Sequence, residues 1–216
     1  IHPAFASAAA SPLAYYKFYA GEGGMRVPLI IAGEPLPEEG VLTNVFSYVT
    51  DITPTILSFA GVKPPGERYA GRRVEPIIGH SLMPLLLGEA DVVYRPDESV
   101  GYELAGHAAL FQGDYKIVYN RGPLGDDQWR LFNIVQDPGE SRDLAGDMPQ
   151  RLQRMLSAYE RYTRENGVLP IPPGYDHRKQ AVLNMLHADL QTPLLVVLLT
   201  ILFILPFYVA FRLKRT

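Results

Sequence analysis

The chain has 216 residues, of which 47% are apolar and 20% are charged, and its formal net charge is −3. This length and apolar content suffice for one globular domain, or one and a half, with a buried core. The slightly acidic balance excludes the basic domain that typically binds nucleic acid. The sequence has no cysteine, which excludes disulfides and thiolate metal sites.

The first distinctive segment runs from Lys17 to Pro28, with the sequence KFYAGEGGMRVP. Its adjacent glycines, Gly23 and Gly24, allow positive φ and a close approach of the backbone to other groups. The apolar run at 27–32 predicts a buried strand of a covered sheet. Lys17 is therefore expected on a loop at the edge of an α/β sheet, where α/β enzymes build their sites.

A helix is predicted after a turn-rich linker, because Asp51 or Thr53 can cap its start and Gly61 can end it. Its apolar face would consist of Ile56, Leu57, Phe59 and Ala60. The Pro- and Gly-rich residues 62–80 then predict a surface excursion, and residues 81–88 predict a short apolar helix or turn.

Further along the chain, the pattern becomes that of an antiparallel sheet. Strands are predicted at 100–110, 115–119 and 129–134. A tight turn at Gly113-Asp114 joins the first two, and an amphipathic helix at 148–166 follows the third. We therefore expect a meander of three or more antiparallel strands with one helix packed on it.

The C-terminal segment predicts a membrane anchor. Residues 193–211 are nineteen uncharged residues, and a helix needs about 20 apolar residues to cross a bilayer core. Arg212, Lys214 and Arg215 follow at once, which indicates a cytoplasmic C-terminus. The alternative is a buried hairpin or core helix. The expected location is the bacterial inner membrane, with the globular part facing the periplasm.

The N-terminus shows no signal-peptide pattern, and the chain begins with Ile1. An exported domain without its own signal would need an upstream part. We therefore expect a processed fragment, a truncated chain or a split gene product.

Several motifs of the chain resemble those of the type I sulfatases (arylsulfatases), in the order of that family. They are the segment 17–28, VTDITPTIL at 49–57, GHSLMPLLLG at 79–88, GDYK at 113–116, WRLFNI at 129–134 and DPGE at 137–140. Together they cover most of residues 1–169 and resemble the C-terminal part of a bacterial arylsulfatase. The resemblance implies an α/β fold class, namely the C-terminal part of an alkaline-phosphatase-like sulfatase fold with a small antiparallel-sheet-plus-helix subdomain and one transmembrane helix.

The expected domain organisation follows from the motifs and the composition together. Residues 1–90 would be the remnant of the α/β sulfatase domain, 91–170 the antiparallel sheet plus helix, 171–190 a juxtamembrane segment, 191–212 the transmembrane helix and 213–216 a cytoplasmic basic tail.

By resemblance, Lys17 matches the lysine that holds a sulfate oxygen and would neutralise charge on the transferring sulfuryl group. A solvated loop lysine is the alternative. Sulfatases of this family use a formylglycine, made from Cys or Ser in a C/S-x-P-S/A-R motif, beside a divalent cation that is usually Ca²⁺. This sequence contains neither that motif nor an Asp-Asn pair. Catalytic, cofactor-binding and metal-binding residues other than Lys17 are therefore expected only in a complete family member.

Other polar residues give weaker indications of a functional site. The adjacent Asp126 and Asp127 predict a solvated turn rather than a metal site, and Glu103, His107 and His80 predict structural hydrogen bonds.

Two functional hypotheses remain open, and in both this chain alone is expected to be inactive. The chain is either the C-terminal portion of a membrane-anchored sulfatase, or a catalytically inert, membrane-anchored accessory subunit of a larger membrane complex. The expected partners are the membrane, a missing N-terminal half or other membrane subunits, and a sulfate ester only if the site is completed. A phosphate- or phosphonate-ester hydrolase of the same superfamily is a third possibility.

Overall fold

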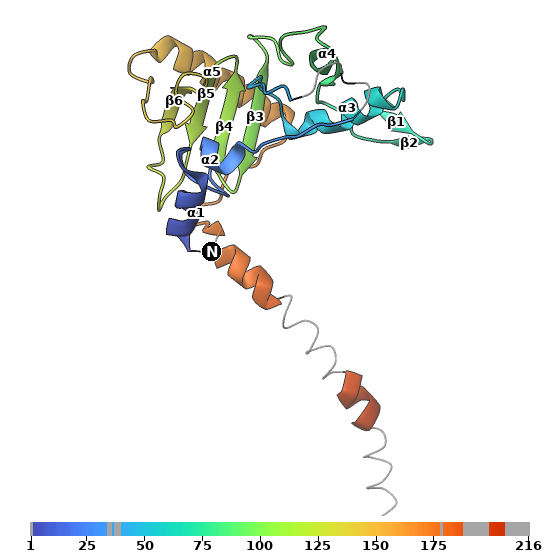
Figure 1. The fold of residues 1–216 in the computed structure, drawn as a ribbon. Coiled ribbons are helices and arrows are strands. Elements are labelled where there is room, and N and C mark those ends of the chain that lie inside the picture. The colour runs from blue at the N-terminus through green and yellow to red at the C-terminus, as the bar shows by residue number, and fades with distance from the viewer. Residues whose placement is uncertain (1, 34–35, 37–39, 178, 188–198, 206–216) are drawn as a thin grey trace, which may run out of the picture. The chain divides into compact units, whose positions relative to one another are not determined.

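The structure is a computed structural model that describes residues 2–33, 36, 40–177, 179–187 and 199–205 (Figure 1). The chain divides into two units, residues 1–168 and residues 169–216. The first unit begins with helix α1 (Pro3–Ala10) and the four-residue helix α2 (Glu22–Met25).

The main sheet of the first unit is an antiparallel meander (Figure 1). Within the described ranges its strands are, in order across the sheet, β3 (Ser99–Leu104), β4 (His107–Gln112), β5 (Tyr115–Tyr119) and β6 (Trp129–Asn133). The predicted strand at 100–110 is in fact a hairpin, since Ala105 and Gly106 have φ of 53° and 84° and form a two-residue turn. The predicted turn at Gly113-Asp114 is confirmed.

Helix α5 (Pro149–Glu165) packs on one face of this sheet, which confirms the predicted helix. The buried residues at this contact are Leu110, Ile117, Leu131, Met155 and Ala158. Gly101 of β3 makes room for the ring of Tyr162 in α5, because a Cβ at Gly101 would lie 2.4 Å from Tyr162 Cγ. The glycine thus sets how closely the helix approaches the edge of the sheet.

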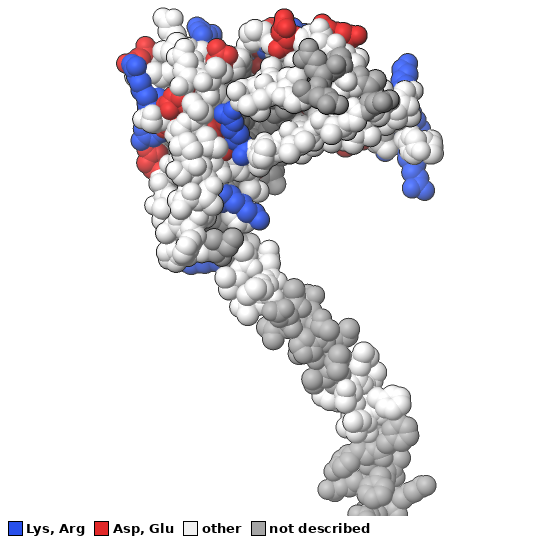
Figure 2. Space-filling model, in the orientation of Figure 1, with Lys and Arg blue, Asp and Glu red and all other residues white. Residues whose placement is uncertain are grey.

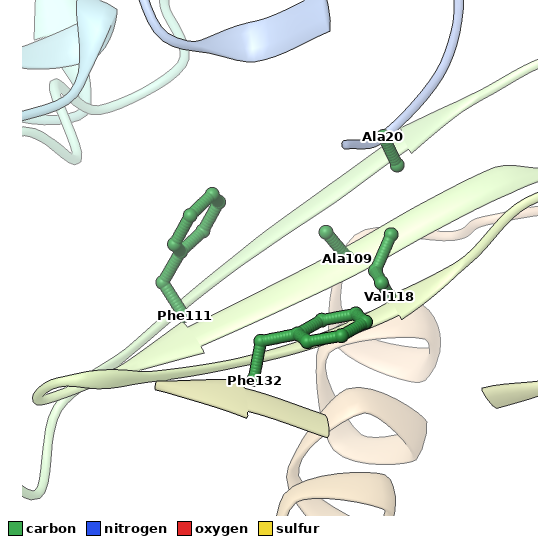
Figure 3. Close-up of a cluster of buried hydrophobic side chains, with 5 residues drawn as sticks. All are labelled: Ala20, Ala109, Phe111, Val118 and Phe132. Atoms are coloured by element: carbon green, nitrogen blue, oxygen red, sulfur yellow. The ribbon is translucent and has the colours of Figure 1, made fainter. Parts of the chain in front are cut away.

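A second cluster covers the opposite face of the sheet (Figure 3). It consists of Ala20, Ala109, Phe111, Val118 and Phe132. Successive strand residues point to opposite faces, so neighbours such as Ala109 and Leu110 belong to different clusters. Ala20 comes from the segment before α2, which therefore lies against this face.

The outer edge of β6 is closed by the loop that follows it. The Leu131 backbone N–H donates to Asp143 Oδ1 at 3.1 Å, and the Leu131 carbonyl accepts from the backbone N–H of Leu144 at 2.7 Å. Arg130 also pairs with Asp143 at 3.0 Å. These contacts satisfy backbone groups that an edge strand would otherwise expose.

Residues 26–98 contain short elements, and few of their described residues are buried. They are the 3₁₀ turn η1 (Val49–Asp51), α3 (Ile52–Phe59), the hairpin strands β1 (Arg68–Tyr69) and β2 (Arg72–Arg73), and α4 (Met83–Leu86). The helices predicted near 51–61 and 81–88 are thus confirmed. Asp51 joins these pieces, because its buried carboxylate accepts hydrogen bonds from the backbone N–H groups of Tyr48 and His80 and from the Tyr94 hydroxyl.

One prediction for the N-terminal part is wrong. The predicted buried strand at 27–32 is not a strand, and Val27 and Ile30 are 77% and 89% exposed. A strand forms only when a neighbouring strand pairs with its backbone, and none of the described strands does so here.

The second unit is helical at 179–187 and 199–205. The rest of the predicted transmembrane segment, 193–198 and 206–211, lies outside the described residues, as does the predicted cytoplasmic tail. In the part of the chain that the structure describes, no helix is long and apolar enough to cross a membrane. The predicted bacterial inner-membrane location, with a periplasmic globular part and a cytoplasmic C-terminus, is therefore wrong.

Candidate functional site

Lys17 lies on an exposed turn between α1 and α2. Its Nζ is 5.4 Å from the centroid of the Phe18 ring, which is within cation–π range. The side chain is thus a cation on the surface of this chain. Whether it binds sulfate stays a prediction.

The residues that follow Lys17 are held firmly against the sheet. The backbone N–H of Ala20 donates to Asn120 Oδ1 at 2.8 Å in a buried contact. The rings of Tyr19 and His107 meet edge to face, with centroids 4.8 Å apart. The loop that carries Lys17 is therefore fixed by β4 and by the end of β5.

A buried ion triad forms the centre of this attachment. The Lys116 Nζ lies 2.9 Å from Glu22 Oε1 and 2.9 Å from Glu140 Oε1, and the Lys116 side chain is 0% exposed. The backbone N–H of Glu22 donates to Glu140 Oε2 at 2.8 Å. Lys116 Nζ also lies 5.1 Å from the centroid of the Phe111 ring. The triad thus joins α2, β5 and the loop after β6.

Sequence reasoning did not single out these three residues, although each lies in a motif of the sulfatase resemblance. Glu22 belongs to EGG, Lys116 to GDYK and Glu140 to DPGE. The sequence did contain one signal for Lys116. It lies two positions before Val118 on the same strand, so the two side chains point to the same, buried face of the sheet. A buried lysine requires carboxylate partners.

The electrostatics of the triad are unbalanced, because two carboxylates share one ammonium. Burial raises the pKa of Glu140 above its ordinary value, and this effect outweighs the lowering by Lys116, while the charge of Glu22 raises it further. Glu140 also has a φ of 52°, a conformation that non-glycine residues adopt only when their surroundings enforce it. Its loop is fixed by Asp137, whose Oδ2 accepts from the backbone N–H of Ser141 at 2.7 Å.

The glycine pair serves close approach rather than positive φ. A Cβ at Gly23 would lie 2.3 Å from the Tyr15 carbonyl oxygen, and one at Gly24 would lie 2.2 Å from the Tyr19 carbonyl oxygen. Any side chain at either position would push α2, and Glu22 with it, away from the sheet.

The hydrogen bonds predicted for three other residues are confirmed. His80 Nε2 lies 2.5 Å from Glu98 Oε1, Glu103 Oε1 accepts from the Gly106 backbone N–H at 2.6 Å, and His107 Nδ1 accepts from the Arg121 backbone N–H at 3.2 Å.

The predicted solvated turn at 126–127 is also confirmed. Asp126 pairs with Arg130, and Asp127 accepts from the Tyr119 hydroxyl at 3.3 Å in an exposed contact.

The residues do not fit the Ca²⁺ site that the resemblance implies for a complete sulfatase. Ca²⁺ takes six to eight oxygen ligands in proteins. Among the residues that the structure describes, no three His, Cys, Asp or Glu side chains come together as such ligands would.

Lys17 does not line either of two hollows on the first unit. One, of about 310 Å³, lies beside the triad and is lined in part by Tyr15, Asn120 and Glu140. The other, of about 580 Å³, lies over α5. Lys17 is exposed and lies outside both linings.

Two sulfatases are similar to this chain in sequence. No family model matches the sequence. An uncharacterized sulfatase of Schizosaccharomyces pombe is 33% identical over 178 residues, which cover 80% of this chain and 31% of that protein. Arylsulfatase K of Xenopus laevis is 29% identical over 153 residues, which cover 65% of this chain and 26% of that protein. The chain thus spans about a third of the length of these relatives or less.

A solved structure shares the fold. The crystal structure of Ps i-CgsB in complex with k-i-k-neocarrahexaose is similar with a TM-score of 0.58 and 22% identity, over 85% of this chain and 38% of that chain. This likeness concerns the fold alone, a mixed helix and sheet fold of the sulfatase (alkaline-phosphatase-like) type. The sequence relatives, and not this likeness, support the sulfatase family for this chain. The two relatives named above are eukaryotic, so they lend no support to a bacterial origin.

Proposed function

We propose that this chain is the C-terminal part of a sulfatase, a sulfate ester hydrolase of the arylsulfatase type, and that Lys17 supplies one wall of its active site. The observation that carries the proposal is the buried triad of Glu22, Lys116 and Glu140. It holds the segment from Lys17 to Gly24 against the sheet while Lys17 itself stays exposed. An ordinary solvated loop lysine needs no such support.

The role of Lys17 in this proposal is electrostatic. Its ammonium group would bind an oxygen of the sulfuryl group and stabilise the charge that develops as the ester bond breaks. The nucleophile and the metal ligands would come from polypeptide outside these 216 residues, because the sequence contains no C/S-x-P-S/A-R motif. This chain alone would then hydrolyse no sulfate ester.

The test compares the chain alone with the polypeptide encoded by the whole reading frame that contains it, using 4-nitrophenyl sulfate. In the active polypeptide, Lys17→Ala should lower kcat/KM about 100-fold, as loss of one transition-state donor does in other enzymes. Lys63→Ala is the matched control, since Lys63 is an exposed loop lysine in the surface excursion. An unchanged kcat/KM for Lys17→Ala would refute the role of Lys17. Turnover by the chain alone would refute the proposal that the nucleophile and the metal ligands lie outside these 216 residues.

A catalytically inert accessory subunit is the second candidate. It is favoured by the missing nucleophile motif, and a whole reading frame without sulfatase activity would support it. The same assay with 4-nitrophenyl phosphate and a phenylphosphonate ester decides between sulfate and phosphorus esters. Faster turnover of either phosphorus ester would replace the sulfatase assignment with a phosphatase or phosphonatase.

A further inference from the structure

The β1–β2 hairpin is basic, although the chain as a whole is acidic. Residues 63–75 contain four basic residues and two acidic ones, Glu67 and Glu75, whereas the whole chain has a net charge of −3. Residues 61–73 are all exposed. Figure 2 shows Lys and Arg atoms on either side of the tip of the arm, where Figure 1 places β1 and β2. The hairpin thus presents a small basic surface to solvent.

The register of the hairpin brings like charges together. Arg68 lies directly opposite Arg73, and Tyr69 lies directly opposite Arg72. Directly opposite residues of two antiparallel strands point to the same face, and two like charges in this position destabilise the pair. An isolated two-stranded hairpin is in any case only marginally stable. An anion bound beside Arg68 and Arg73 would remove their repulsion.

No carboxylate of the described residues forms an ion pair with any of the three hairpin arginines. Arg68 Nη2 donates to the Gly71 carbonyl oxygen at 3.0 Å, which ties this side chain to the turn. Arg72 and Arg73 are exposed, and Tyr69 is 66% exposed beside them. The hairpin therefore offers guanidinium groups and an aromatic ring to a partner from outside the described chain.

We propose that the β1–β2 hairpin is a docking surface for a sulfated polysaccharide, on a different element from the one that carries Lys17. The choice of polyanion rests on the proposed function, because a sulfate ester hydrolase acts on molecules that carry sulfate groups. Guanidinium groups bind carboxylates and phosphates through two parallel hydrogen bonds, and a sulfate group offers oxygens in the same way. Tyr69 adds an apolar ring with a polar hydroxyl, which suits a surface that is partly wet. A nucleic acid fits less well, since the domains that bind it are basic as a whole.

The experiment measures binding of dextran sulfate to the polypeptide encoded by the whole reading frame. The hairpin variant, Arg72→Gln with Arg73→Gln, should bind about 10-fold more weakly, the sum of two exposed charge contacts. Its slope of log K against log salt should fall by about 2, one for each lost cation. The matched control is the α5 variant, Arg154→Gln with Arg161→Gln, which removes the same charge from two other exposed arginines. It should bind within about twofold of wild type, because salt screens distant charges.

Absence of binding, or equal binding by wild type and the hairpin variant, would overturn the proposal. Equal weakening in both variants would also overturn it, since the response would then depend on net charge alone. Binding of poly-glutamate or double-stranded DNA as tightly as dextran sulfate would refute the sulfated polysaccharide as the partner.

Turnover of 4-nitrophenyl sulfate by the same samples is a separate readout. Hairpin-dependent binding without turnover would refute the proposed function and leave the docking surface in place. Turnover without hairpin-dependent binding would refute the docking surface and leave the proposed function in place.

Discussion

Replacing Lys116 with methionine tests the triad directly. Methionine matches the length of the buried stem but removes the ammonium that faces Glu22 and Glu140 at 2.9 Å each. At an effective dielectric constant of about 20, each contact is worth about 6 kcal/mol before the cost of burying the ions. Because that cost offsets much of the gain, we expect a net loss of about 3–5 kcal/mol in the free energy of unfolding, the usual result of leaving a buried charge without its partner.

The assay is urea unfolding followed by the fluorescence of Trp129, the sole tryptophan, which packs edge to face on Tyr159 of α5 with centroids 4.9 Å apart. The loss should shrink as the pH is lowered toward 5, since burial raises the pKa of Glu140 and its protonation removes one of the abandoned charges. In the triple variant Glu22→Gln, Lys116→Met, Glu140→Gln, most of the lost stability should return. A loss below about 1 kcal/mol for Lys116→Met alone, the range of an exposed ion pair, would refute the assignment of a buried triad.

Two further predictions concern the sheet and the pH response. Gly101→Ala should lower the free energy of unfolding by about 1–3 kcal/mol, because the new Cβ would meet the Tyr162 ring at 2.4 Å; Gly146→Ala, with open space around it, is the control in the same urea titration. Since the pKa of Glu140 is raised in the folded state, its contribution to stability should increase as the pH falls through that pKa toward the usual 4.5 and level off below it. Glu140→Gln removes this contribution. The free energy of unfolding of the wild type, measured relative to that of the variant, should therefore increase as the pH is lowered from 7.5 to 5. A decrease over this range would contradict the raised pKa.

Local sequence signals predicted the elements whose partners lie nearby in the chain. The turn at Gly113-Asp114, the strand beginning at Trp129 and helix α5 all have their packing partners within the same meander, so pattern and turn chemistry agree with the fold. The hairpin at Ala105-Gly106 was missed because an alanine in the left-handed region gives no signal of its own.

The failures and omissions have a common cause, which is dependence on distant residues. The apolar run at 27–32 predicted a buried strand, but a strand also needs neighbours that the described residues do not supply. Lys116 lies 94 positions from Glu22, so the triad could not be found from local spacing. Lys17 was located through the family resemblance, and its chemistry is still a prediction.

The closed edge of β6 has a consequence for how this chain behaves when made alone. With Leu131 engaged by Asp143 and Leu144, that edge offers little to another molecule seeking a strand to pair with. The open, apolar run at 27–32 has no such protection. The run at 27–32 should therefore promote misassembly of the isolated chain, and a charge placed at Ile30 should make the chain easier to keep in solution.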